Sequence, residues 1–331
     1  MNAPLEINAK RLEERLYKLG QYGRIEATER GVCSLALSES NIQATIDVIA
    51  EMESLGLMVQ IDPVGNVFAV RPDKHGNTQR DIILSGSHID TVPTGGIYDG
   101  RLGVEGALEA FRRMNEEGIE TDRPVACCIF LAEEGARYQP AMIGSRYFCG
   151  LMSEDEALNV RSHIAGDDSR LGVELEVFRA RLREAYASGR LQHDYTAWER
   201  VDLSRIRSYV ELHIEQGPEM EEHGVSVEAV QAVLGISQRI VTLAAEQAKQ
   251  TALAAFQLVR EVREVANTFR GEQRATVGIL ETTETEPLPR PTNHQLRYTV
   301  HGETAHAGGG VMRYRRDAAY AAAVLVERAG M

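Results

Sequence analysis

The chain has 331 residues, of which 43% are apolar and 26% are charged, and its formal net charge is −13. This composition is typical of a globular protein and argues against a disordered one, and the length is sufficient for two domains. The acidic balance excludes nucleic acid as an expected partner, because no surplus of Lys and Arg is available to neutralise phosphates. No stretch approaches the ~18 consecutive apolar residues of a membrane span, and no signal peptide is visible, so we expect no membrane partner.

Four cysteines bear on the redox compartment. They are Cys33, Cys127, Cys128 and Cys149, and the adjacent pair lies in an apolar, strand-like run without forming a CxxC motif. Few cysteines with no pairing pattern are typical of reduced intracellular proteins. We therefore predict a cytoplasmic protein with buried thiols.

The first half of the chain alternates predicted helices with predicted strands. Helical spacing of apolar residues and short apolar runs between turns predict helices over 8–20, 40–56 and 103–117, and strands over 57–62, 67–70, 81–85 and 125–132. The turn Gly65-Asn66 joins the first two strands into a hairpin. This alternation predicts an α/β fold with a mixed, mostly parallel sheet covered by helices.

The second half of the chain differs from the first in its charge content and in its predicted elements. Residues 151–208 are charge-rich and predict solvated helices, and the alternating run 209–215 predicts a strand that ends at Gln216. After Gly235 the expected elements are a helix over 243–267, strands over 274–281 and 296–301, and a helix over 315–329. We therefore place a domain boundary near residue 236, followed by a compact α+β unit.

Candidate metal ligands follow several of the predicted strands. His88 and Asp99 come after one strand, Glu133 and Glu134 after another, and His213 lies near the end of a third. Chemistry gathers at the carboxyl ends of parallel strands. Imidazole with carboxylate suits zinc, manganese, cobalt or nickel, and a carboxylate can bridge two ions ~3.5–4 Å apart.

The acidic residues near these ligands suggest three different roles: metal binding, proton transfer and orientation of an imidazole. Of the neighbouring Glu133 and Glu134, one can bind metal while the other faces a water as general base. Asp90 lies two residues from His88, where it can accept the second N–H of the imidazole and hold the ring.

Each candidate also has an ordinary structural interpretation. A histidine in a strand, such as His213, is more often a core residue, a Glu-Glu pair is usually on the surface, and Asp99 fits turn chemistry. The coincidence of all of them at the ends of apolar runs supports the metal site, and spacing alone leaves the structural and the metal-site interpretations open.

Several segments resemble the N-carbamoyl-L-amino-acid hydrolase, ureidopropionase and allantoate amidohydrolase family, a branch of the aminoacylase-like two-metal peptidases. They are Ser87–Asp90, Tyr98–Gly100 with Leu102–Val104, Glu133–Tyr138 and Glu211–Pro218. The resemblance runs through most of residues 6–240. Simple peptidases of the clan usually carry a glutamate where this chain has a histidine at position 213.

The resemblance implies a homodimer with a metal-binding catalytic domain over 1–236 and a lid and dimerisation domain over 237–331. It also implies two divalent metal ions. By motif position, His88, Asp99 and His213 bind one ion, and Asp99 bridges to a second.

The same motifs imply the remaining roles. Glu134 holds the second ion, and Glu133 is the general base. Gln216 matches a residue that contacts substrate. His306, in the lid segment 302–308, is expected to stabilise the oxyanion in the partner subunit's cleft. Arg316 matches an arginine that follows that segment and is a candidate for substrate binding.

Two features depart from the family pattern. The segment 276–280 precedes the lid segment 302–308, whereas the family has them in the opposite order. The family's last metal ligand, a histidine in a segment that returns to the catalytic domain, has no counterpart within these 331 residues.

The expected activity is hydrolysis of the C–N bond of a carbamoyl or ureido group on a small carboxylate, such as an N-carbamoyl-L-amino acid. The alternatives are an allantoate amidohydrolase and a catalytically impaired dimerising homologue that lacks the last metal ligand. A peptidase or aminoacylase is disfavoured by His213 and Gln216.

Overall fold

The computed structural model describes residues 6–230, 243–245, 257, 260 and 294–296. The chain divides into two compact units, Met1–Ile214 and Glu215–Met331. The boundary predicted near residue 236 lies outside the described residues, as do His306 and Arg316 and most of the predicted lid.

The first unit contains the following helices and strands. The helices are α1 (Ala9–Gly20), α2 (Glu39–Ser54), α3 (Arg101–Glu116), α4 (Ile143–Phe148), α5 (Glu154–Leu158), α6 (Leu171–Ala187) and the 3-10 turn η1 (Leu203–Arg205). The strands are β1 (Gly31–Val32), β2 (Met58–Ile61), β3 (Val67–Arg71), β4 (Ile82–Ser87), β5 (Gly95–Gly96), β6 (Val125–Ile129) and β7 (Ile206–Val210).

A five-stranded sheet in the order β2-β3-β6-β4-β7 forms the centre of this unit. β3 runs antiparallel to both β2 and β6, and β4 runs parallel to both β6 and β7. Every strand of this sheet except β3 therefore points the same way. The predicted α/β fold with a mixed sheet flanked by helices is confirmed, including the β2–β3 hairpin.

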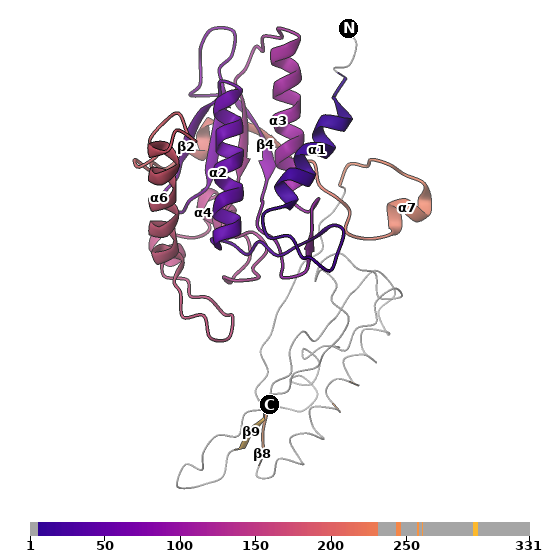
Figure 1. Ribbon diagram of the computed structural model, residues 1–331, viewed down its shortest axis with the longest axis vertical. Coiled ribbons are helices and arrows are strands. Elements are labelled where there is room, and N and C mark those ends of the chain that lie inside the picture. The colour runs from indigo at the N-terminus through magenta and orange to yellow at the C-terminus, as the bar shows by residue number, and fades with distance from the viewer. Residues whose placement is uncertain (1–5, 231–242, 246–256, 258–259, 261–293, 297–331) are drawn as a thin grey trace. The chain divides into compact units, whose positions relative to one another are not determined.

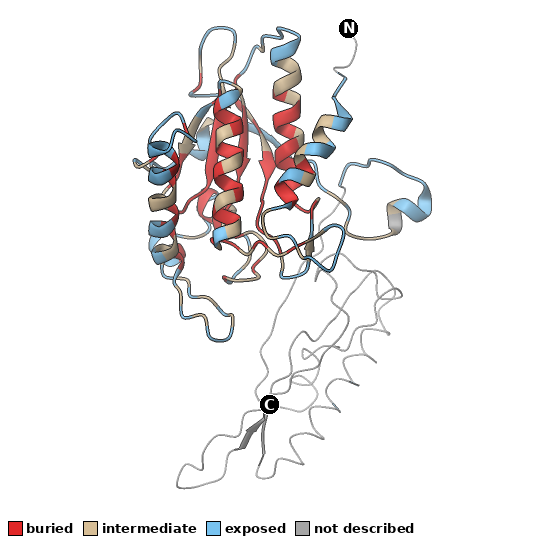
Figure 2. Ribbon diagram, in the orientation of Figure 1, coloured by how far each residue is buried: buried red, intermediate tan, exposed pale blue. Residues whose placement is uncertain are grey.

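The two faces of the sheet pack against separate apolar cores. Successive residues of β6 point to opposite faces: Cys127 joins the core formed with α2, α3 and α6, and Cys128 joins a smaller core with Phe148 of α4. Figure 1 shows α1, α2 and α3 on the near face of the sheet. Figure 2 shows the buried residues concentrated along α2, α3 and the strands behind them.

Side-chain caps begin two of the helices on the near face, α1 and α2. Asn8 accepts a hydrogen bond from the Arg11 amide at the start of α1, and Ser38 accepts one from the Asn41 amide at the start of α2. These caps satisfy amides that have no partner within the helix. The predicted helices over 8–20 and 40–56 match α1 and α2 closely.

The strand predicted over 209–215 is shifted from the observed one. β7 covers Ile206–Val210, so His213 follows the strand instead of lying in it. The start of the strand is not apparent from the sequence, because the charged residues Arg205 and Arg207 flank Ile206 and interrupt the apolar pattern. Its end cannot be read from the alternating pattern, because the pattern continues after the ladder with β4 has ended at the pair Ser85–Val210.

The charge-rich region 151–208 is helical only in part. α5 and α6 are its α-helices, η1 precedes β7, and the segments between these elements are largely irregular. α6 packs Leu175, Phe178 and Leu182 into the main core. Charged residues on its outer face, such as Glu176, Arg183 and Glu184, are exposed as expected.

The described parts of the second unit are short. They include α7 (Glu219–His223) and the antiparallel pair β8 (Leu243–Ala245) and β9 (His294–Leu296). The helix predicted over 243–267 is therefore wrong at its start, because pairing with β9 outweighs the helix propensity of alanine; Gln257 and Arg260 are helical. The predicted elements 274–281 and 315–329 lie outside the described residues.

Two of the four cysteines match the prediction of buried thiols. All four cysteines are free; Cys127 and Cys128 are buried as predicted, whereas Cys149 is exposed at the end of α4. Among the described residues, no helix combines the length and apolar character that crossing a bilayer requires.

Candidate metal centre

Three parallel strands bring the predicted ligands to one edge of the sheet. β4 ends at Ser87 and His88 follows directly, while the paired strand β6 ends opposite it at Ile129. Glu133 lies a few residues beyond β6, and His213 follows β7 on the other side of β4. Since the strands point the same way, their following loops meet at the same edge.

Asp99 reaches this edge from the other direction, at the start of α3. Gly100 is the N-cap of α3 and has φ 64°, a conformation that favours glycine. A Cβ at this position would lie 2.5 Å from the His88 imidazole. The absence of a side chain at Gly100 therefore lets the His88 ring lie directly against the helix start that carries Asp99.

The two histidines and Asp99 form a compact group of potential ligands. His88 Nε2 is 3.6 Å from Asp99 Oδ1, and His213 Nε2 is 3.3 Å from the same oxygen. Among the described residues these three form the group whose ligand atoms all lie within 4.8 Å of one another. Ligands at ~2.0–2.2 Å around a four-coordinate ion lie ~3.3–3.6 Å apart, so the donor set and the two separations from Asp99 fit a divalent metal ion.

Both imidazoles are held in the tautomer that suits this role. His88 Nδ1 is 3.0 Å from the carbonyl oxygen of Asp90, and His213 Nδ1 is 2.8 Å from that of Ile214. A carbonyl can only accept, so each Nδ1 donates its proton, and the nitrogen left to bind a metal ion is Nε2, which faces Asp99 in both rings. The sequence predicted Asp90 as the partner of His88, and the carbonyl, rather than the carboxylate, makes the shorter contact (3.7 Å for Oδ1).

The carboxylate of Asp90 holds the turn that carries the glutamate pair. Its two oxygens accept hydrogen bonds from the amides of Glu133 (3.2 Å) and Glu134 (3.3 Å). Glu133 Oε2 lies 3.5 Å from His88 Nε2, and its side chain is about one-third exposed. Asp90 thus links the β4 loop to the β6 loop and places Glu133 beside the ligand group.

The site concentrates negative charge around a buried imidazole. Although burial lowers the pKa of His88, contact with Asp99 and the charges of nearby carboxylates outweigh burial and raise it to about 10. Burial also raises the pKa of Asp90 and of Glu133, while His88 opposes both shifts. A cation between these groups would relieve the repulsion among the carboxylates.

Glycines in α3 allow the segment after β7 to reach Asp99. A Cβ at Gly103 would lie 2.8 Å from the Leu212 carbonyl oxygen and 2.8 Å from Ser87 Cβ. At Gly106 it would lie 3.1 Å from Leu212 Cδ2. The chain therefore crosses the first turns of α3 at close range, which brings His213 against Asp99.

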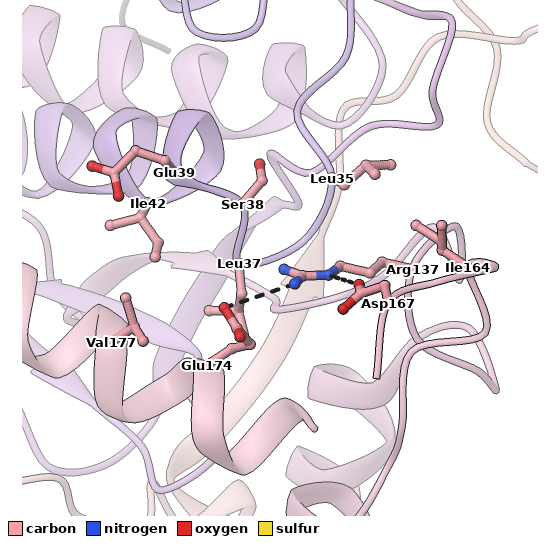
Figure 3. Close-up of a pocket in the computed structure, with 10 residues that line it drawn as sticks. All are labelled: Leu35, Leu37, Ser38, Glu39, Ile42, Arg137, Ile164, Asp167, Glu174 and Val177. Carbon is pink, nitrogen blue, oxygen red and sulfur yellow. Dashed lines mark hydrogen bonds and ion pairs between the residues drawn. The ribbon is translucent and has the colours of Figure 1, made fainter. Parts of the chain in front are cut away.

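A separate cavity of about 490 Å³ lies between α2, α6 and the segment that follows the glutamate pair (Figure 3). None of the three grouped ligands lines it. Arg137 occupies one side, where its Nε is 3.0 Å from Asp167 and its Nη1 donates to the Ala36 carbonyl oxygen at 3.0 Å. Arg137 therefore anchors the segment after Glu134 to its surroundings.

The other predicted site residues stay predictions. Gln216 belongs to the second unit, and the structure does not describe His306 or Arg316. The backbone amide of Glu134 donates a hydrogen bond to the Asp90 carboxylate, and the metal-binding role of Glu134 stays a prediction. Sequence reasoning assigned no individual role to Gly100, Gly103 or Ser87, although all three lie within segments that carry the family resemblance.

The fold and the ligand group define an α/β protein with a candidate centre for a divalent metal ion. Residues 84–313 match peptidase family M20/M25/M40, and the chain belongs to this family.

Individual relatives agree with this assignment. The chain is 34% identical over 284 residues to an N-carbamoyl-L-amino acid amidohydrolase of Geobacillus stearothermophilus, covering 83% of this chain and 64% of the relative. It is 34% identical over 230 residues to an allantoate amidohydrolase of Bacillus subtilis, covering 69% of this chain and 50% of the relative. The chain thus spans less than two thirds of the length of these curated relatives.

A solved structure extends the similarity to the fold. A hydantoinase/carbamoylase family amidase from Burkholderia ambifaria superposes with a TM-score of 0.65 at 27% identity, covering 90% of this chain and 70% of that chain.

The contact between Gly100 and His88 predicts a specific effect on metal binding. Gly100→Ala should weaken zinc binding by ~10–100-fold, the range seen when the support of a ligating imidazole is lost, because the new Cβ displaces the ring. Gly118→Ala is the matched control, since Gly118 has φ 62° and a Cβ there would meet no atom within 4 Å. Zinc affinity by competition with a chelator checks this, and equal affinities in both variants would contradict the role of Gly100.

Proposed function

We propose that the chain carries the metal-dependent hydrolytic centre of an amidohydrolase that cleaves the C–N bond of a carbamoyl or ureido group on a small carboxylate. The observation that carries the proposal is the group of His88, Asp99 and His213, with a histidine at position 213 where simple peptidases of the clan carry a glutamate. The names of the relatives from Geobacillus stearothermophilus and Bacillus subtilis support the same class of reaction.

The proposed metal content is two divalent ions, zinc, manganese, cobalt or nickel. His88 and His213 would bind one ion, Asp99 would bridge both, and Glu134 would bind the second. The bound ions would polarise the scissile carbonyl and lower the pKa of a water. Support comes from the donor set, because imidazole with carboxylate suits this group of metals.

Glu133 is the proposed general base. Its carboxylate lies 3.5 Å from His88 Nε2, beside the ligand group and partly open to solvent. From there it can take a proton from the water that adds to the ureido carbonyl carbon, and then deliver it to the departing nitrogen. Asp90 fixes the Glu133 amide during both transfers.

The overall reaction on an N-carbamoyl amino acid balances simply. One water is consumed, and the products are the amino acid, carbon dioxide and ammonia. Allantoate is the second candidate substrate, which would lose ammonia from one ureido arm, and the relative from Bacillus subtilis favours it.

Further roles are proposed from motif position. Gln216 and Arg316 would contact the substrate, and His306 would stabilise the oxyanion in the partner subunit of a homodimer. A cytoplasmic location is also proposed, and the four free cysteines support it.

Metal analysis with an ammonia-release assay tests the proposal as a whole. The protein should bind close to two ions per chain and release ammonia from members of a panel of ureido and carbamoyl acids. A protein that binds no ion and releases no ammonia would instead be an impaired homologue.

Asp99→Ala should remove both ions, because a bridging carboxylate contacts both. His88→Ala and His213→Ala should each mainly weaken one ion. Metal content per chain after gel filtration measures this, and unchanged occupancy in Asp99→Ala would rule out the dinuclear centre.

Glu133→Gln should keep its metal and lose at least ~10²-fold in turnover, the usual scale for a positioned proton acceptor. Glu134→Gln is the control, since it should lose metal as well. If metal is lost from Glu133→Gln and retained in Glu134→Gln, the two roles are reversed.

His306→Ala should lower turnover by ~10²–10³-fold with metal content intact, the scale for an oxyanion donor. Mixing inactive His306→Ala with inactive Glu133→Gln subunits should then restore activity, because one cleft of the hybrid dimer carries neither lesion. Verified hybrids that stay inactive would show that His306 does not act across the interface.

A further inference from the structure

Glu211 connects the ends of the two strands that lead to His88 and His213. It follows β7 directly and lies two residues before His213. Its Oε1 accepts a hydrogen bond from the hydroxyl of Ser87, the residue immediately before His88. Its Oε2 lies 2.7 Å from the hydroxyl of Tyr209. One carboxylate therefore contacts both ligand-bearing segments.

Tyr209 extends this connection into the sheet. Its hydroxyl is also 3.1 Å from the Gly86 carbonyl oxygen of β4, so its single proton has two acceptors within reach. Its ring packs edge-on against Phe130, which follows β6, with the ring centroids 6.1 Å apart. Through these contacts Glu211 is tied to the ends of β4, β6 and β7 together.

The backbone ladder does not by itself place the segment that carries His213. The last registered pair between β4 and β7 joins Ser85 to Val210, one residue before Glu211. The His213 ring is tethered to the Ile214 carbonyl, which belongs to the same segment and cannot fix it to β4. The side chain of Glu211 thus lies where the ladder stops and the ligand segment begins.

We infer that Glu211 is a positioning residue that sets the separation of His88 from His213, and thereby the affinity and ligand geometry of the centre. This inference rests on the proposed metal centre. Loss of a residue that hydrogen-bonds to a metal ligand and orients it typically lowers metal affinity by ~10–100-fold.

Cobalt(II) serves as the probe, because its visible absorption reports the ligand geometry as well as binding. Glu211→Ala should raise the cobalt Kd by about tenfold or more, the lower end of that range, and should alter the spectrum. Glu211→Gln can keep the bond from Ser87, and Tyr209→Phe leaves that bond intact, so both should give smaller changes. Combining Glu211→Ala with Tyr209→Phe should add less than the sum of the single effects, because the two residues share one bond.

Tyr195→Phe is the matched control. It removes a hydrogen bond of the same kind, from the Tyr195 hydroxyl to Glu53 Oε1 at 2.8 Å, elsewhere in the same unit. This variant should lower the melting temperature and leave both the cobalt Kd and the spectrum unchanged.

The possible results distinguish a failure of the positioning role of Glu211 from a failure of the proposed metal centre. A Glu211→Ala protein that melts earlier but keeps the parent's cobalt Kd and spectrum would overturn the positioning role and leave the metal centre standing. Equal cobalt changes in Tyr195→Phe would also overturn it. A parent protein that binds no cobalt would overturn both. If Glu211→Ala does not fold, Ser87→Ala decides, because it removes the bond from Ser87 to Glu211; the parent's cobalt Kd and spectrum in that variant would overturn the inference.

Discussion

The close approach of the first turns of α3 to the end of β4 is the constraint on which the candidate centre depends. Side chains at Gly100 or Gly103 would occupy the space of the His88 ring or of Ser87 and Leu212. The missing side chains let a buried imidazole, a helix-start carboxylate and the segment after β7 share one small volume. Asp99, at the start of the helix, also supplies one oxygen that lies 3.6 Å from His88 Nε2 and 3.3 Å from His213 Nε2.

A second set of contacts fixes the loops around this volume. Asp90 is central, since its carbonyl orients His88 and its carboxylate binds the amides of Glu133 and Glu134. The buried guanidinium of Arg101 donates to the carbonyls of Leu19 and Ile89, which ties the same loop to α1. Preorganisation of this kind lets a metal ion bind without ordering its ligands first, and it places the candidate base beside them.

Much of this could be predicted from the sequence, and the failures have physical causes. Helical and strand periodicities located α1, α2, α3, β2, β3, β4 and β6, and the strand-end rule gathered His88, Asp99 and His213. The end of β7 was missed because alternation in side chains does not show where a partner strand stops. The helix over 243–267 was wrong at its start because cross-strand pairing is non-local. The roles of Gly100 and Gly103 could not be predicted, because a sequence does not show which segments of the folded chain approach each other closely.

The central claim is that His88, Asp99 and His213 bind one divalent ion together. Anomalous diffraction from crystals of the cobalt-loaded protein tests it most directly, because the difference map locates the ion independently of activity. The account predicts a peak within bonding distance of His88 Nε2, Asp99 Oδ1 and His213 Nε2. A strong peak bound by other residues, with none among these three atoms, would contradict it.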